Sequence, residues 1–111
     1  MTKYNARATT IDGIRFASKA EAARYTELKL LQEAGEIEAL ELQPRFEIWS
    51  AINQIANKID RIHYIADFKY FQDGRTIVED VKGVLTPVYR MKKKMFLAGY
   101  PHIKFIEVKN A

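Results

Sequence analysis

The sequence predicts an α/β (α+β) fold with a mixed central sheet flanked by helices. Its 111 residues are enough for one hydrophobic core but too few for two. Two segments carry apolar residues at helical spacing, and the stretches between and after them are rich in aromatic and β-branched residues. Strands mixed with helices at this length are typical of a sheet that helices cover. We therefore expect residues 1–111 to form one domain.

The first helix is expected from Ser18 to about Ala34. Ser18 and Glu21 form a Ser-x-x-Glu capping box, and Gly35 provides the stop. The inward face of this helix is expected to consist of small and aliphatic residues, namely Ala20, Ala23, Leu30, Leu31 and Ala34.

The second helix is expected from Pro87, which follows Thr86, to Gly99, because proline is favoured in the first turn of a helix. Strand and turn signals lie, in chain order, around Asp12-Gly13 and in residues 44–49, 62–71, 76–82 and 103–108. Residues 50–61 are expected to be a connection. The core order that follows is αβββαβ.

The hairpin between residues 62 and 82 determines which side chains meet. If Asp73 and Gly74 are the two central turn residues, counting outward places Asp67 directly opposite Asp80. Lys82 lies two residues beyond Asp80 and therefore shares its face of the sheet. Directly opposed like charges are destabilising, so a cation is expected to offset the repulsion.

The composition limits what this site can be. The chain has no cysteine, which excludes thiolate nucleophiles and Cys-based zinc sites. Its two histidines are too few for a His-rich metal site. Two carboxylates suit Mg²⁺, which one or two carboxylates bind together with waters and phosphate oxygens. The alternative is a solvent-facing hairpin whose charges only keep the sheet soluble.

The stretch Ala66-Asp67 followed by Asp80-Val81-Lys82 resembles the signature of the PD-(D/E)XK nucleases, with Ala66 in place of the proline. The order helix, three strands, helix, strand is also that of these domains. The resemblance implies that Asp67 and Asp80 bind Mg²⁺ or Mn²⁺ and that Lys82 is catalytic. A lysine in that place would position or help deprotonate the attacking water.

Five segments are similar to a family of small phage and prophage proteins catalogued as nuclease-like, namely residues 16–21, 35–37, 42–44, 64–68 and 79–83. By this resemblance Glu21 is the third acidic ligand, although a Glu at this position of a capping box also has a structural role. Glu27 competes for the role because it lies in the middle of the apolar stripe of the first helix. Gln43 is a candidate contact to a metal-bound water or to substrate.

A basic stripe is expected on the second helix. Arg90, Lys93 and Lys94 lie three and four residues apart, Lys92 extends the stripe, and the formal net charge is +4. Positive charge beside an acidic metal site suits a DNA backbone. The alternative is a solvated helix face whose lysine stems cover apolar neighbours.

These features together predict a metal-dependent DNA endonuclease that hydrolyses phosphodiester bonds, with branched DNA, as for Holliday-junction resolvases, as a refinement. A resolvase cuts two strands symmetrically, which implies a homodimer. The chain lacks an apolar run of about 20 residues and the apolar core of a signal peptide, so we expect no membrane partner and a cytoplasmic location. The resemblance to phage and prophage proteins implies that the cell is a bacterial host. The alternatives are a catalytically silent DNA-binding or phage assembly module on the same fold, and a small α+β protein with a chance motif.

Overall fold

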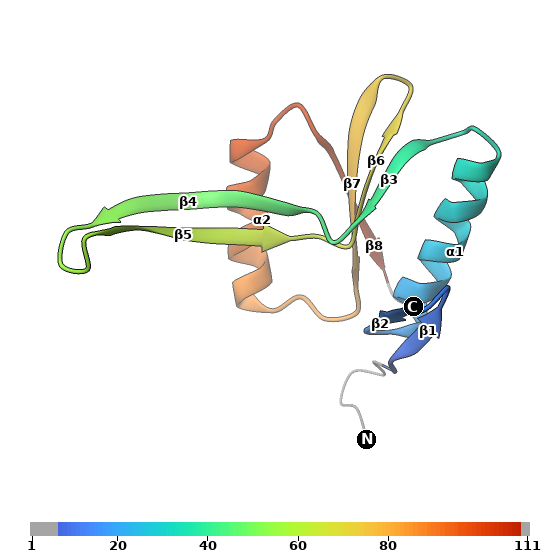
Figure 1. Cartoon of the computed structure of the whole chain (residues 1–111), viewed down its shortest axis with the longest axis horizontal. Coiled ribbons are helices and arrows are strands. Elements are labelled where there is room, and N and C mark those ends of the chain that lie inside the picture. Colours follow the sequence, from blue (N-terminus) through green and yellow to red (C-terminus); the bar gives the residue numbers. More distant parts are fainter. Residues whose placement is uncertain (1–6, 110–111) are drawn as a thin grey trace.

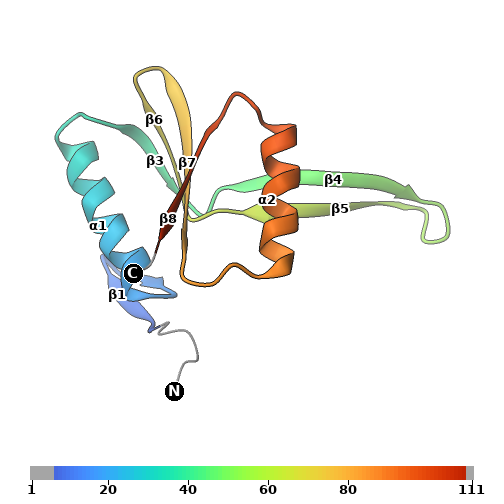
Figure 2. The ribbon, with the colours of Figure 1, turned by 180° about the vertical axis from the view of Figure 1, so that it is seen from behind.

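The computed structural model describes residues 7–109 and confirms the α+β class, with a mixed sheet flanked by helices. The elements in chain order are β1 (Thr9–Ile11), β2 (Ile14–Phe16), α1 (Lys19–Glu33), β3 (Glu38–Leu42), β4 (Arg45–Asn53), β5 (Lys58–Ile65), β6 (Phe68–Gln72), β7 (Arg75–Lys82), α2 (Pro87–Gly99) and β8 (Lys104–Lys109). The central sheet has the order β3-β6-β7-β8, with β8 parallel to β7 and the other pairs antiparallel. The helices α1 and α2 lie on opposite sides of this sheet (Figures 1 and 2).

The sheet separates two hydrophobic clusters, one under each helix. On the α1 side, Tyr25 and Leu28 pack with Phe68 and other residues of the sheet. On the α2 side, Phe96 contacts the rings of Phe46 and Tyr64, with centroids 4.8 and 5.1 Å apart. Neighbouring residues of β7 point into different clusters, since Ile77 belongs to the α1-side cluster and Val78 to the α2-side cluster, as strand geometry requires.

The bounds of both helices agree with the sequence, but the expected inward face of α1 was wrong except for Leu31, which packs against the core from the edge. Ser18 caps α1 by accepting a hydrogen bond from the Glu21 amide at 3.1 Å, and Thr86 caps α2 in the same way. The face of α1 that is buried consists of Glu21, Ala22, Tyr25 and Leu28. Tyr25 and the polar Glu21 carry this face, so a pattern based on aliphatic spacing alone missed it.

From Phe68 to Gln72 the β6–β7 hairpin has the predicted register, but the ladder ends at the pair Phe68–Glu79, so Asp67 and Asp80, predicted to pair directly, lie outside it. Gln72 pairs with Arg75 and Lys69 with Val78, around a turn at Asp73 and Gly74. Both turn residues have positive φ, 51° and 73°, which Asp tolerates and Gly adopts freely. A two-residue loop of this kind sets the pairing of the whole hairpin.

Two strand assignments from the sequence were wrong. The expected strand at 62–71 is broken at Ala66 and Asp67, because β5 pairs with β4 while β6 pairs with β3 and β7. Residues 50–61, expected as a connection, belong to a long hairpin of β4 and β5. The strand expected at 44–49 is part of β4 in this hairpin and does not join the central sheet, whose first strand is instead β3. The αβββαβ order therefore holds for α1, β3, β6, β7, α2 and β8, with a different first strand from the expected one and with the hairpin inserted.

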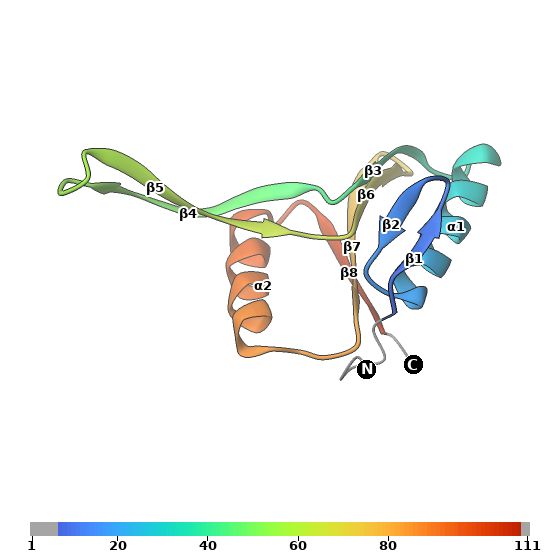
Figure 3. The ribbon, with the colours of Figure 1, turned by 60° about the horizontal axis from the view of Figure 1, so that its bottom comes forward.

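We call residues 45–65, which comprise β4, β5 and their turn, the arm. Its root packs on α2, and its tip extends away from the rest of the molecule (Figure 3). The predicted turn at Asp12-Gly13 is confirmed and forms a small hairpin of β1 and β2 beside α1. Within residues 7–109, no helix is long and apolar enough to cross a membrane.

Candidate functional site

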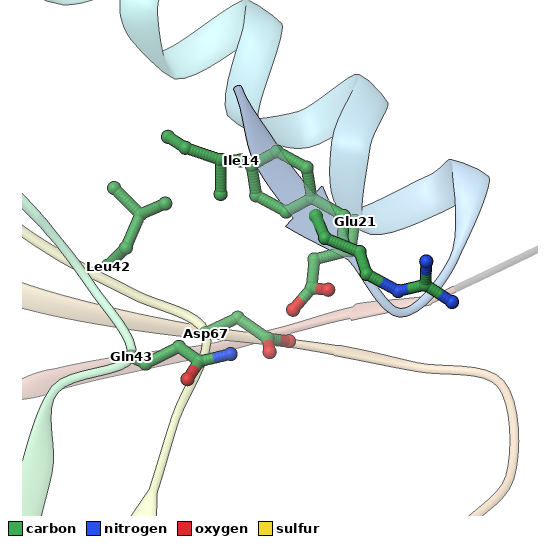
Figure 4. A pocket seen from close by; sticks show the side chains of 7 residues that line it. Ile14, Glu21, Leu42, Gln43 and Asp67 are labelled. Atoms are coloured by element: carbon green, nitrogen blue, oxygen red, sulfur yellow. The ribbon is translucent and has the colours of Figure 1, made fainter. Parts of the chain in front are cut away.

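A pocket of about 410 Å³ lies where the start of α1, the β1–β2 hairpin and the chain before β6 meet. Its lining consists of Ile14, Arg15, Phe16, Glu21, Leu42, Gln43 and Asp67. The carboxyl groups of Glu21 and Asp67 point toward one another at one side of this pocket (Figure 4). Two acidic side chains that are 46 positions apart in the sequence are thus brought together by the fold.

Glu21 is held in place by the cap of α1. Its own amide is bound by Ser18, and its Oε2 accepts a hydrogen bond from the Ala17 amide at 3.0 Å. The side chain is buried. The capping role and the pocket position are therefore compatible, because the backbone contact uses one carboxylate oxygen and leaves the other for the pocket.

Asp67 lies at the break between β5 and β6, one residue before the ladder begins. Its Oδ2 accepts a hydrogen bond from the Val81 amide at 2.7 Å. Burial, the hydrogen bond to the Glu21 carboxyl group and the negative charge of Asp80 raise the pKa of Asp67 from 3.8 to about 9. An acidic group in this environment is stable only with a proton or with a nearby cation.

Asp80 lies on the α2 side of β7, and neither Asp80 nor Lys82 is among the residues that line the pocket of Glu21 and Asp67. It is only 1% exposed, accepts a hydrogen bond from the Tyr64 hydroxyl and has Oδ1 3.2 Å from the Lys82 Nζ. The Lys82 ammonium also lies 4.4 Å from the centre of the Tyr89 ring. The shared face of Asp80 and Lys82, predicted from strand alternation, is therefore confirmed.

The other side of β7 carries a buried acidic group that the sequence did not single out. Glu79 is fully buried and accepts two hydrogen bonds of 2.7 Å from Arg24, and a third from the Tyr70 hydroxyl. This contact raises the pKa of Arg24 above its already high value. The sequence indicated only that Glu79, as the neighbour of Asp80 in a strand, points to the other face of the sheet. Its partner Arg24 is 55 residues away, so no local pattern links the two.

The structure separates the two remaining candidate site residues, Glu27 and Gln43. Glu27 is exposed and pairs with Arg24 at 3.0 Å on the outside of α1, away from the pocket lining. Gln43 lines the pocket, and its backbone N–H donates a hydrogen bond to the Asp67 carbonyl oxygen at 2.9 Å. Of the residues named from the sequence, Glu21, Asp67 and Gln43 thus meet in one pocket, and Glu27 does not join them.

The basic stripe of α2 is divided between exposed and internally bonded side chains. Lys93 pairs with Glu107 at 3.1 Å, and Lys92 donates to the His63 carbonyl oxygen at 3.0 Å. Arg90 and Lys94 are exposed. The stripe that the spacing predicted therefore presents two of its four members freely to solvent.

The donor set fits a hard divalent cation only in part. In the described range 7–109, no three His, Asp or Glu side chains converge closely enough to hold a metal ion by themselves. Glu21 and Asp67 do supply two carboxylates, and Mg²⁺ is usually held by one or two carboxylates with waters and substrate phosphate completing its shell. Asp80 is near enough for its charge to raise the pKa of Asp67, but in this conformation Tyr64 and Lys82 occupy both of its oxygens.

Two comparisons with known proteins bear on this site. A search of the curated proteins found no match. A family model described as "Protein of unknown function (DUF1064)" matches residues 1–111, which include the pocket, the arm and both helices. Because that match extends over the whole sequence, the chain belongs to the DUF1064 family.

Proposed function

We propose that this protein is a metal-dependent DNA endonuclease that hydrolyses phosphodiester bonds, with Mg²⁺ or Mn²⁺ as its cofactor. The observation that carries the proposal is the meeting of the Glu21 and Asp67 carboxyl groups in a pocket, with Asp80 close enough for its charge to raise the pKa of Asp67. Acidic groups with strongly raised pKa values in a cleft are typical of functional sites. The resemblance of Asp67, Asp80 and Lys82 to the PD-(D/E)XK signature supports the same reaction.

Each residue has a distinct part in the proposal. Glu21 and Asp67 hold the metal ion, which when bound neutralises phosphate charge and activates water. Asp80 would be the third acidic group of the site, with the oxygen that Lys82 now holds. Lys82, whose Nζ lies 3.2 Å from Asp80 Oδ1, would have to leave Asp80 to orient the attacking water. Gln43 is placed at the pocket wall, where a substrate or a water would pass.

DNA is the proposed polyanion, and branched DNA the proposed preferred form. Arg90 and Lys94 are the exposed cations of α2, the helix that directly follows β7, and Arg15 lines the pocket itself. Such cations bind phosphates without reading sequence. From the resemblance to small phage proteins, we propose that this activity takes place in the cytoplasm of a host cell.

The test measures cleavage of a four-way junction and of linear duplex DNA during titration with Mg²⁺ or Mn²⁺, and metal binding by calorimetry without DNA. Asp67→Asn and Lys82→Ala are expected to lower the cleavage rate about 100-fold or more. Asp73→Asn is the matched control, because Asp73 is exposed in the hairpin turn, where Asn tolerates its positive φ.

The control and the wild type should retain both cleavage and metal binding. Absence of cleavage together with absence of metal binding would contradict the proposal. Binding of DNA without cleavage under all metal conditions would favour the silent DNA-binding or phage assembly module instead.

A further inference from the structure

A buried ion pair joins α1 to β7 close to the acidic pocket. The Nε and Nη2 atoms of Arg24 donate hydrogen bonds of 2.7 Å to the two carboxylate oxygens of Glu79, and the Tyr70 hydroxyl donates a third. The Glu79 side chain is fully buried, and that of Arg24 is 23% exposed. The proposed metal site uses neither of these side chains as a ligand.

Stability alone does not account for an ion pair in this place. Removing two charges from water costs free energy that their attraction only partly returns, and apolar residues of similar size are often as stabilising or more so. On its face of β7, Glu79 lies between Ile77 and Val81, which both pack in the apolar cluster under α1. What the ion pair provides, and apolar contacts do not, is direction, because a planar guanidinium binds a carboxylate in one orientation.

One member of the pair is bound to Asp67 through its backbone. The Asp67 amide donates to the Glu79 carbonyl oxygen at 3.1 Å, and the Val81 amide donates to Asp67 Oδ2 at 2.7 Å. Glu79 thus contacts Asp67 with its backbone and Arg24 with its side chain. A shift of Glu79 relative to α1 would therefore carry Asp67 with it.

The other member of the pair is next to Glu21. Arg24 follows Glu21 by three positions in α1, so the two side chains are neighbours on the helix surface. The helix has a second polar contact with the sheet, in which the Leu40 amide donates to Gln32 Oε1 at 2.8 Å. Gln32, however, lies in the last turn of α1, at the opposite end from Glu21. The ion pair is thus the directional contact nearer to the pocket.

We infer that Arg24 and Glu79 are positioning residues, which determine how the Glu21 and Asp67 carboxyl groups face one another. Glu21 is fixed on α1 by its cap, Asp67 is fixed on β7 by two hydrogen bonds, and the ion pair fixes α1 against β7. Apolar packing alone would keep the two elements in contact but would let α1 slide or rotate slightly. A misplacement of about 1 Å can cost an active site about 100-fold in rate.

This inference deepens the proposed function and rests on it for its consequence, because the metal ion belongs to that proposal. The geometric part does not depend on a metal ion: the ion pair sets the separation of the two carboxyl groups in the metal-free protein as well. The separation and the metal affinity can therefore be measured independently.

The test variant is the double substitution Arg24→Met and Glu79→Met, which replaces the pair by apolar side chains and leaves no buried charge. Crystal structures of the metal-free full chain, wild type and variant, give the distance from Glu21 Cδ to Asp67 Cγ, and calorimetry gives the affinity for Mn²⁺. The distance is expected to change by about 1 Å or more. The affinity is expected to fall about 10- to 100-fold, while urea unfolding shows a folded protein.

Two single variants complete the experiment. Glu27→Gln is the matched control, because it removes the exposed 3.0 Å contact of Arg24 and leaves the bonds to Glu79 in place; it should keep the wild-type distance and affinity. Arg24→Lys keeps a positive charge beside Glu79 but lacks the planar fork, so it remains informative if the double variant does not fold. It should change both quantities in the same direction as the double variant, but by less.

An unchanged carboxyl separation in the folded double variant, or in Arg24→Lys if the double variant does not fold, would overturn the inference. A changed separation with wild-type affinity for Mn²⁺ would support the inference and contradict metal binding by Glu21 and Asp67. A wild type that neither binds Mn²⁺ nor cleaves DNA would contradict the proposed function, and the crystal structures would still decide the inference.

Discussion

The environment of Asp67 makes a specific prediction about stability and pH in the absence of metal. In the unfolded chain the Asp67 carboxyl group titrates near 3.8, whereas in the folded protein its pKa is raised to about 9. The folded protein therefore holds a proton that the unfolded chain has released. The free energy of unfolding contributed by this group is fully present below about pH 4 and is lost as the pH rises toward about 9.

The size of the effect follows from proton linkage. One proton gives a slope of at most about 1.36 kcal/mol per pH unit, or about 2.7 kcal/mol between pH 6 and pH 8. The pocket is open to water, which screens part of the charge, so we expect a loss of about 1 to 2 kcal/mol over that range. For a domain of about 100 residues this corresponds to a fall in Tm of about 4 to 16 °C.

Asp67→Asn should remove this slope, because the amide is neutral at every pH and its oxygen can still accept the bond from the Val81 amide. In EDTA the variant should therefore be more stable than the wild type at pH 8 and close to it at pH 5. Urea unfolding across this pH range measures the difference, with Asp73→Asn as the control. Equal slopes for the wild type and Asp67→Asn would refute the reasoning.

Three further predictions concern the neighbouring groups. Arg24→Met should lower the free energy of unfolding in urea by about 3 kcal/mol, because it leaves Glu79 as a buried unpaired charge. The double variant with Glu79→Met should recover most of that stability, and a loss below about 1 kcal/mol for the single variant would contradict the prediction. Tyr64→Phe removes the hydroxyl that binds Asp80, so it should lower stability by about 1 to 2 kcal/mol and weaken metal binding; Tyr100→Phe, whose hydroxyl binds only the exposed Glu47 carbonyl oxygen, should leave metal binding unchanged. The double variant Arg90→Ala and Lys94→Ala should reduce the slope of log K for DNA binding against log salt concentration by about two phosphate contacts, whereas Lys104→Ala should not change it. An unchanged slope in the double variant would exclude α2 from the DNA contact.

Local signals account for the parts of the fold that were predicted correctly. Ser18, Thr86 and Gly35 set helix ends through caps and a stop, and Asp73-Gly74 set the hairpin register through the backbone angles that the turn requires. These signals act within a few residues, so a single sequence contains them. The class of the fold followed from the number and spacing of such elements.

The arm could not be predicted for the opposite reason. Alternation of apolar and polar residues marks a strand only when one of its faces is buried. The arm buries little beyond Phe46 and Tyr64, and both of its faces carry isoleucines, so residues 50–61 lacked the pattern of a half-buried strand. The break at Ala66 and Asp67 was hidden because β5 and β6 follow one another in a single aromatic run.

Charge pairing in the interior shows why the site is where it is. In the part of the chain that the structure describes, Glu79 is paired with Arg24, Asp80 with Lys82, and the half-buried Glu107 with Lys93, which together with Tyr89 lowers the pKa of Glu107. Glu21 and Asp67 instead face one another, acid against acid. Because burying an unpaired charge is costly, a fold that neutralises its other buried acids one by one and leaves this pair together requires a proton or a cation at that point. If the proposed cation binds there, the pocket beside the pair gives it and a phosphate ligand access from solvent, which a structural ion pair would not need.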